Sequence, residues 1–289
     1  MTLISRLVFP TQRKTPQKTS EVIRIEDISV VIPVKDNQVG IDQYIKVLTE
    51  LKTRLPKEVI IVDNNSSNPI TVPVDDIKGM SVELLSCKTP GPAAARNLGV
   101  RNASGKWILF NDSDCIPTES TFQGFMRARP GALAYAGNVK ALHRDLVSKY
   151  YESQEILLPL KTILDDGSHV PQYLVTANAL IWKPAFDSLN GFNERIAIAG
   201  GEDVDLGLRL SEIGRLEYAM ERVVDHDFSD GIHGFWNRFK RYGRGNRMVE
   251  EIWGVSMKPL RFPPNKKSPL NWALAWLQFL SLYMVYFQR

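Results

Sequence analysis

The sequence predicts an α/β protein whose central sheet is mostly parallel and is flanked by helices. Short runs of β-branched residues alternate along the chain with segments whose apolar residues recur at helical spacing. The connections between these segments are short, as is typical of strand–helix–strand units. The chain has 289 residues, of which 44% are hydrophobic, and this is sufficient for one large domain with its own core.

The first elements follow from simple patterns. Residues 28–34 are rich in β-branched side chains, which predicts a strand buried on both faces. Between residues 40 and 55, apolar side chains recur every three or four positions and predict a helix. Residues 59–62 predict a second buried strand, which ends at a polar cluster of turn-forming residues that begins at Asp63.

The alternation of strands and helices continues along the chain. We expect strands at 82–85 and 107–110, with a helix between them that begins after Pro92, because proline is favoured in the first turn. Beyond residue 130 the pattern is mixed. There we expect a strand at 173–182 and a helix that begins near Glu202.

We expect three segments in the chain. Residues 1–27 are polar and predict a loosely ordered extension, and residues 28–268 predict one compact domain. Residues 269–289 predict an apolar helix, since fifteen of the eighteen residues from 270 to 287 are apolar and none is charged. Such a helix would extend about 27 Å, at the short limit for a membrane span. It suits peripheral membrane contact, packing on the domain, or packing on a second copy of the chain.

The charge and the cysteines exclude several classes of protein. The net charge of +4 is too small to indicate a nucleic-acid partner. Residues 235–267 nevertheless contain nine basic and two acidic residues, and this stretch would attract anionic headgroups.

The two cysteines, Cys87 and Cys115, cannot form a disulfide framework or a zinc ribbon. The first residues lack the apolar run of a secretory leader, so we expect a cytoplasmic protein.

Carboxylates follow three of the predicted strands. Asp36 follows the first, Asp63 the second, and Asp112 and Asp114 the strand at 107–110. Ligands bind at the carboxyl ends of parallel strands, so these side chains mark the expected site. Two carboxylates on either side of Ser113 offer the oxygen ligands that Mg²⁺ and Mn²⁺ prefer. Aspartate and serine are also ordinary turn residues, and the D-x-D pattern alone is therefore a weak signal.

Two further stretches carry candidate residues. Glu202 and Asp203 follow two glycines and begin a predicted helix; such acids commonly cap a helix, but Asp203 could also accept a proton from an acceptor hydroxyl. Arg238 and Arg241 share a helical face and suit a diphosphate, although a solvated basic face is an equal alternative. His226 could complete a metal site, but a lone histidine is more often structural.

Three familiar enzyme signatures are missing from the sequence. No G-x-G-x-x-G follows the first strand, and no G-x-x-x-x-G-K-[ST] occurs in the chain. The sequence also lacks H-E-x-x-H. These absences argue against a dinucleotide-binding Rossmann enzyme, a P-loop nucleoside triphosphatase and a zinc protease.

Six blocks in register resemble the family 2 glycosyltransferases, which have the GT-A fold, a Rossmann-like sheet. The blocks cover residues 28 to about 210 and are 30–36 (VVIPVKD), 60–66 (IIVDNNS), 94–99 (AARNLG), 110–114 (FNDSD), 189–194 (LNGFNE) and 201–206 (GEDVDL). The resemblance implies an inverting transferase that moves one sugar from a nucleotide-sugar, with a UDP-sugar expected, and that uses Mn²⁺ or Mg²⁺.

The resemblance also implies a role for each candidate residue. Asp203 would be the general base, and Asp114, with Asp112 and His226, would hold the metal ion. The acceptor would contact Gly201, Glu202 and Trp236. The nucleotide-sugar would be bound by a larger set, namely Pro33, Asp36, Asp63, Asn64, Arg96, Asp112, Ser113, Arg241 and Arg244.

The sequence departs from the family pattern at two places. Asn64 replaces a second acid after the second strand, which weakens the expected uracil contact, and the Q-x-x-R-W signature of processive synthases is absent. We therefore expect transfer of a single sugar to a glycan, a lipid-linked molecule or a small molecule, at the cytoplasmic face of the membrane. The alternatives are a non-catalytic scaffold with this fold and a sugar nucleotidyltransferase. The latter would need a glycine-rich basic loop after the first strand, where glycine is absent before Gly40.

Overall fold

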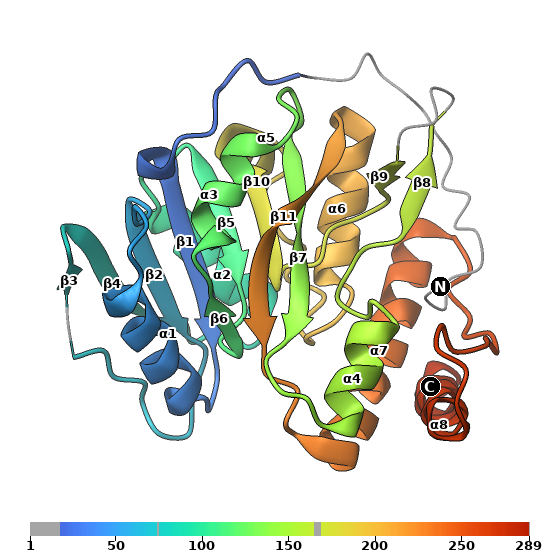
Figure 1. The fold of residues 1–289 in the computed structure, drawn as a ribbon. Helices are drawn as coiled ribbons and strands as arrows, with labels where there is room; N and C mark the ends of the chain where they lie inside the picture. The colour runs from blue at the N-terminus through green and yellow to red at the C-terminus, as the bar shows by residue number, and fades with distance from the viewer. Residues whose placement is uncertain (1–17, 74, 165–168, 289) are drawn as a thin grey trace.

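The computed structural model describes residues 18–73, 75–164 and 169–288, and its centre is a nine-stranded mixed sheet (Figure 1). The strand order is β3-β4-β2-β1-β5-β10-β7-β11-β6, and β8 and β9 form a separate hairpin. The strands are β1 (Ile28–Val34), β2 (Glu58–Asp63), β3 (Asp76–Ile77), β4 (Met80–Ser86), β5 (Trp107–Asn111), β6 (Cys115–Pro117), β7 (Ala134–Ala141), β8 (Lys161–Ile163), β9 (His169–Pro171), β10 (Asn178–Trp182) and β11 (Leu216–His226).

Helices cover both faces of the sheet. Residues of α1 and α3 pack in one core cluster with β1 and β2, and residues of α2, α5 and α6 pack in a second cluster on the opposite face. The helices are α1 (Gln38–Glu50), α2 (Pro92–Asn102), α3 (Ser120–Gln123), α4 (Leu146–Ser153), α5 (Lys183–Ser188), α6 (Glu202–Ile213), α7 (Gly231–Trp253) and α8 (Pro269–Tyr286), with short 3-10 helices at Ile25–Asp27 and Gly124–Arg127. The predicted α/β fold is confirmed.

The sheet is parallel over only part of its width. β4, β2, β1 and β5 are mutually parallel, as predicted for strands that alternate with helices. β10 runs antiparallel to both of its neighbours, β5 and β7. The expected strand at 173–182 was too long, since only Asn178–Trp182 joins the ladder. Tyr173 and Leu174 are buried without strand pairing, and their apolar character had suggested a strand there.

The described part of the N-terminal extension packs on the core. Ile23 is 8% exposed and Ile25 3% exposed, and both belong to the cluster that contains β1. Residues 1–17, which also fall in the predicted extension, lie outside the described residues.

The helix predicted at the end of the chain is α8, and it packs against α7. Gly243 of α7 allows this close contact, because a Cβ atom there would lie 2.6 Å from the carbonyl oxygen of Leu282. Gln278 and Ser281, two of the polar residues in this helix, are fully buried and so face the protein. Over the described ranges, with gaps at 74 and 165–168, no helix is long and apolar enough to cross a bilayer.

Candidate active site

A cavity of about 770 Å³ opens where the chain leaves β1 and β5 and where α6 begins. α7 and α8 complete its wall. Asp63, His226 and Trp236, three of the predicted site residues, are not part of the wall. The predicted residues that do line the cavity are Pro33, Asp36, Asn64, Arg96, Asp112, Ser113, Asp114, Gly201, Glu202, Asp203, Arg241 and Arg244.

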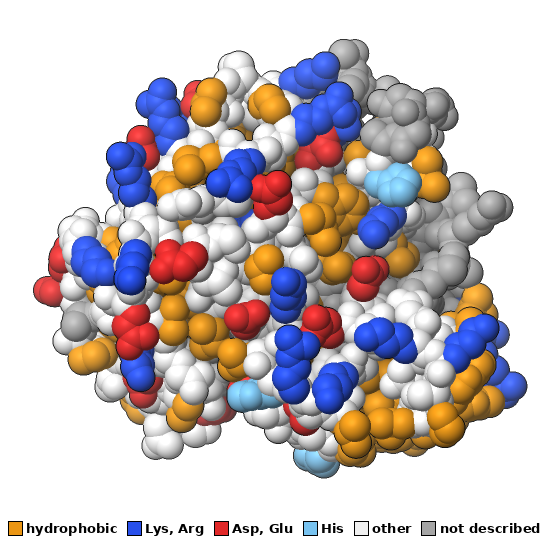
Figure 2. All heavy atoms as spheres, viewed as in Figure 1, with side chains coloured by type: hydrophobic (Ala, Val, Ile, Leu, Met, Phe, Trp, Pro, Cys, Tyr) orange, Lys and Arg blue, Asp and Glu red, His pale blue; other side chains and the backbone are white. Residues whose placement is uncertain are grey.

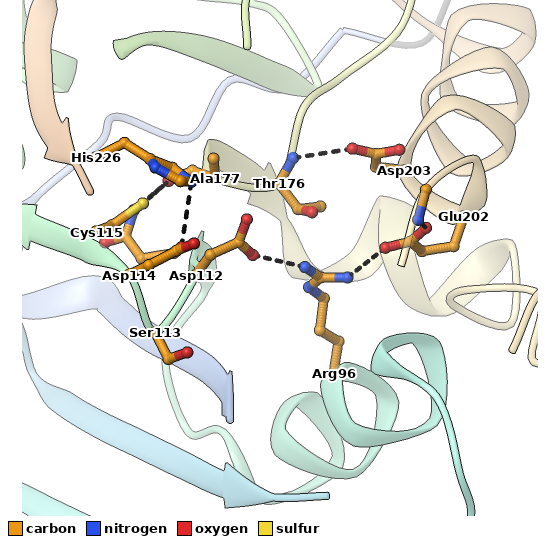
Figure 3. A network of polar contacts seen from close by, with 12 residues as sticks. Arg96, Asp112, Ser113, Asp114, Cys115, Thr176, Ala177, Glu202, Asp203 and His226 are labelled. Atoms are coloured by element: carbon orange, nitrogen blue, oxygen red, sulfur yellow. Dashed lines mark hydrogen bonds and ion pairs between the residues drawn. The ribbon is translucent and has the colours of Figure 1, made fainter. Parts of the chain in front are cut away.

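Arg96 connects two carboxylates that are distant in sequence. Its Nη2 lies 2.7 Å from Oδ1 of Asp112, and its Nη1 lies 2.8 Å from Oε1 of Glu202 (Figure 3). Burial alone would lower the pKa of Arg96, but Asp112 and Glu202 outweigh this effect and raise it. The guanidinium is therefore a permanent cation that fixes the residues after β5 relative to the start of α6.

The start of α2 explains the position of Arg96. Pro92 occupies the first turn, where its missing N–H costs no hydrogen bond. Gly91 precedes it with a positive φ of 108°, and its N–H donates to Oδ1 of Asn64 at 2.8 Å. Arg96 lies one turn further along α2 and is only 3% exposed.

Asp203 lies beside this ion-pair network at the start of α6. Its Oδ2 accepts a hydrogen bond from the backbone N–H of Thr176 at 3.4 Å (Figure 3). Burial and the nearby charge of Glu202 raise the pKa of Asp203 to about 7, although Arg96 acts in the opposite direction. A carboxyl group with this pKa can accept a proton near neutral pH and release it again.

Two glycines shape the loop before Asp203. Gly200 and Gly201 have positive φ angles of 137° and 104°, which side chains with a Cβ atom rarely adopt. The loop also approaches α7 closely, since a Cβ atom on Gly201 would lie 3.0 Å from the carbonyl oxygen of Gly245. The N–H of Gly200 donates to Oε2 of Glu202 at 2.7 Å, which holds the loop against the helix start.

Asp114 and His226 form a cluster with metal-ligand character. Oδ1 of Asp114 lies 3.2 Å from Nε2 of His226 (Figure 3). Together with Sγ of Cys115, ligand atoms from these residues lie within 4.8 Å of one another. Burial, with help from the charge of Arg238, lowers the pKa of His226 to about 3, so the ring is neutral as a metal ligand requires. Asp112 is outside this cluster and pairs with Arg96 instead.

Arg238, which the sequence analysis grouped with Arg241 as suited to a diphosphate, lies in the cavity wall. It lies on α7, one turn before Arg241, and is 8% exposed. Its Nη2 lies 3.9 Å from Oδ2 of Asp114 and 3.5 Å from Oδ2 of Asp230. Arg241 lies in the same wall, as expected from the i, i+3 spacing that places both cations on one helical face.

The residues predicted to bind the nucleoside form a connected loop region. Oδ1 of Asp36 accepts from the N–H of Ser67 at 2.6 Å, and Oδ1 of Asp63 accepts from the N–H of Ser66 at 3.0 Å. Partial burial raises the pKa of Asp63, but hydrogen bonds from Ser66 outweigh this effect and leave the pKa below its usual value. Asp63 thus organises the loop, whereas Asp36 lines the cavity.

Asn64 uses its amide group to hold the loop that follows β4. Its Nδ2 donates to the carbonyl oxygens of Cys87 and Thr89, at 3.2 and 2.6 Å. A carboxylate at this position could not donate either hydrogen bond. The departure from the family pattern therefore has a structural explanation.

The sequence analysis did not connect two other parts of the wall with the site. Three residues of the segment before β10 and the inner face of α8 line the cavity. The sequences of both segments are apolar, and an apolar pattern alone does not indicate which cavity a segment lines. The residues they contribute are Tyr173, Val175, Thr176, Gln278 and Leu282.

Comparison of the sequence with known proteins identifies its relatives. The sequence model of glycosyl transferase family 2 matches residues 29–174. The pre-mycofactocin glycosyltransferase of Mycobacterium tuberculosis is 30% identical over 236 residues, which cover 75% of this chain and 46% of that protein. The probable glycosyltransferase YdaM of Bacillus subtilis is 22% identical over 82% of this chain and 59% of that protein. The chain thus spans about half the length of these relatives.

Solved structures share the fold. The mannosyltransferase PcManGT from Pyrobaculum calidifontis, in complex with GDP-Man and Mn²⁺, superimposes with a TM-score of 0.55 and 16% identity over 96% of this chain and 78% of that chain. GalNAc-T7, solved with UDP, GalNAc and Mn²⁺, gives a TM-score of 0.51 and 13% identity over 70% of this chain and 43% of that chain. At these identities the comparison concerns the fold alone.

Proposed function

Because the chain belongs to glycosyl transferase family 2, we propose that it transfers one sugar from a nucleotide-sugar to an acceptor hydroxyl. The observation that supports this most strongly is the single cavity in which Arg96 joins Asp112 to Glu202, next to Asp203. A cationic and acidic region suited to a diphosphate thus adjoins a carboxylate suited to deprotonate a hydroxyl.

Asp203 is the proposed general base of a direct, inverting displacement. The acceptor oxygen attacks the anomeric carbon as its proton passes to a carboxylate oxygen of Asp203. The bond between that carbon and the diphosphate oxygen breaks, and the nucleotide leaves with the bonding electron pair. The N–H of Thr176 orients the Asp203 carboxylate. Arg238, Arg241 and Arg244 offer positive charge to the leaving diphosphate.

Asp114 and His226 fit a divalent cation. A carboxylate oxygen and a neutral imidazole nitrogen that lie close together are ligands that Mn²⁺ accepts, and Mg²⁺ would use the carboxylate. When bound, such an ion would neutralise charge on the leaving diphosphate. Asp112 and Ser113 line the same cavity and would contact the nucleotide.

The donor is proposed to be a UDP-sugar, with its nucleoside near Pro33, Asp36 and Asn64. The acceptor, which is a glycan, a lipid-linked molecule or a small molecule, would approach Glu202 and Gly201. Trp236 is not in the cavity wall, so a contact with the acceptor there would have to involve an acceptor that extends beyond the cavity.

We further propose peripheral contact with the cytoplasmic face of a membrane through α8. Its outer side exposes six large apolar residues, and Phe287 directly after the helix is exposed as well. Figure 2 shows apolar side chains gathered where Figure 1 places α8, with Lys and Arg nearby. Lys258 and Arg261 lie over aromatic rings of this segment, at 5.5 Å from Phe287 and 4.6 Å from Trp276. Aromatic rings beside cations suit an anionic lipid interface. A second copy of the chain is the alternative partner for this surface.

Calorimetric titration with UDP, GDP, CDP and dTDP, each with and without Mn²⁺, tests the proposal. We expect one nucleotide to bind, and to bind more tightly with Mn²⁺. Absence of binding to all four by the folded protein would refute the donor assignment and favour a non-catalytic scaffold.

A further inference from the structure

One side of the cavity is apolar, in contrast to the charged region around Arg96. Leu157, Val175, Phe239 and Leu282 line this side and pack together in a single core cluster. They come from the chain after α4, the segment before β10, α7 and α8. Apolar surface that adjoins a charged site favours a ligand with an apolar part.

The apolar side begins next to the proposed base. Val175 directly precedes Thr176, whose N–H donates to Asp203. Tyr242, also in the cavity wall, lies close to Gly200 and contacts Phe239 edge-on, with ring centroids 5.7 Å apart. A molecule whose hydroxyl reached Asp203 would therefore place its remaining atoms against aromatic and aliphatic side chains.

Gln278 supplies a polar group next to the apolar side. It is fully buried at the cavity wall, and its Oε1 accepts a hydrogen bond from the hydroxyl of Tyr150 at 2.7 Å. Its Nε2 has no hydrogen-bond partner among the residues that the structure describes. A buried donor without a partner is costly, and a ligand oxygen at this position would satisfy it.

We propose that the acceptor carries its reactive hydroxyl on an apolar body, which lies against Leu157, Val175 and Leu282, and that Nε2 of Gln278 donates to an acceptor oxygen. The inference rests on the proposed function, since it takes Asp203 as the group that receives the hydroxyl proton. It narrows the acceptor from any sugar or small molecule to an amphipathic one. The inner side of α8 would then contact the acceptor, whereas its outer side is exposed at the protein surface.

A series of n-alkyl β-D-glucosides, from methyl to octyl and below their micellar concentrations, tests the apolar side. Binding is measured by calorimetry on the full chain, with and without saturating UDP and Mn²⁺. We expect each added methylene to tighten binding by about fourfold while the apolar side fills. Equal affinity of the methyl and octyl compounds would overturn the proposal.

Two leucines of α8 provide a matched pair of variants. Leu282 is 2% exposed at the cavity wall, whereas Leu280 is 45% exposed on the outer side. Leu282→Asn should abolish most of the gain in affinity that comes with a longer alkyl chain, and Leu280→Asn should leave this gain unchanged. The reverse result would place the alkyl chain on the outer side of the helix and overturn the proposal. If Leu282→Asn fails to fold, the wild-type series still decides the question.

The donor group of Gln278 is tested separately. Gln278→Met should weaken binding of octyl glucoside by about three- to tenfold. Tyr150→Phe is the control, because it removes the internal hydrogen bond but keeps Nε2. Equal binding by Gln278→Met and wild type would refute the assignment of Gln278. Titration of the wild type with UDP and Mn²⁺ distinguishes failure of the proposed function from failure of this inference. Absence of UDP binding counts against the proposed function. UDP binding with no effect of alkyl chain length on glucoside binding counts against this inference alone.

Discussion

The dependence of activity on pH is the most informative prediction for Asp203. As a general base it must be ionised, and its pKa is raised to about 7 by burial and by Glu202. Activity should therefore increase with pH and be lost as the pH falls through 7. The ionised fraction is about one-eleventh at pH 6 and about ten-elevenths at pH 8, so kcat/KM should rise about tenfold between them.

The assay follows release of the nucleotide from the donor at saturating Mn²⁺, from pH 5 to 9. His226 stays neutral over this range, because burial lowers its pKa to about 3, and it cannot produce the acid limb. Glu202→Gln removes a neighbouring negative charge and should move the midpoint to lower pH. A profile that is flat from pH 5 to 8 would show that Asp203 has an ordinary pKa or is not the base.

Three other variants have distinct expected outcomes. Asp114→Ala should weaken UDP binding in Mn²⁺ at least about tenfold, since even outer-shell partners of metal ligands contribute that much. It should have no effect on UDP binding in EDTA. An equal loss of affinity in both conditions would show that Asp114 is not a metal ligand. Asn64→Asp should lower the free energy of unfolding by about 1–3 kcal/mol in urea titrations, because the carbonyls of Cys87 and Thr89 lose their donors; unchanged stability would contradict this. The double variant Trp272→Ser, Trp276→Ser should reduce sedimentation of the protein with anionic vesicles and leave UDP binding intact. Undiminished sedimentation would show that the outer side of α8 does not make the membrane contact.

The parallel part of the sheet was predictable from local sequence. The runs at 28–34 and 59–62 are β-branched and buried on both faces, and β1 and β2 extend over 28–34 and 58–63. The strand expected at 173–182 was partly wrong for a physical reason. Residues such as Tyr173 are apolar because they are buried beside the cavity, and burial without strand pairing leaves the same pattern as a buried strand.

The site was only partly predictable. Acids that follow parallel strands meet at one edge, so the placement of Asp36 and Asp112 along one cavity follows from strand order. The pairing of Arg96 with Glu202 joins residues 106 positions apart and depends on how α2 and α6 pack. The place of Gln278 in the wall could not be inferred either, since composition does not tell which face of an apolar helix meets a cavity.

The most direct test of the central claim is release of nucleotide from a panel of UDP- and GDP-sugars with water as the acceptor. It needs no knowledge of the natural acceptor, because water would lose its proton to the same base. We predict Mn²⁺-dependent release from one nucleotide class by the wild type, and none by Asp203→Asn, which should still bind the nucleotide. Equal release by Asp203→Asn and wild type would contradict the account.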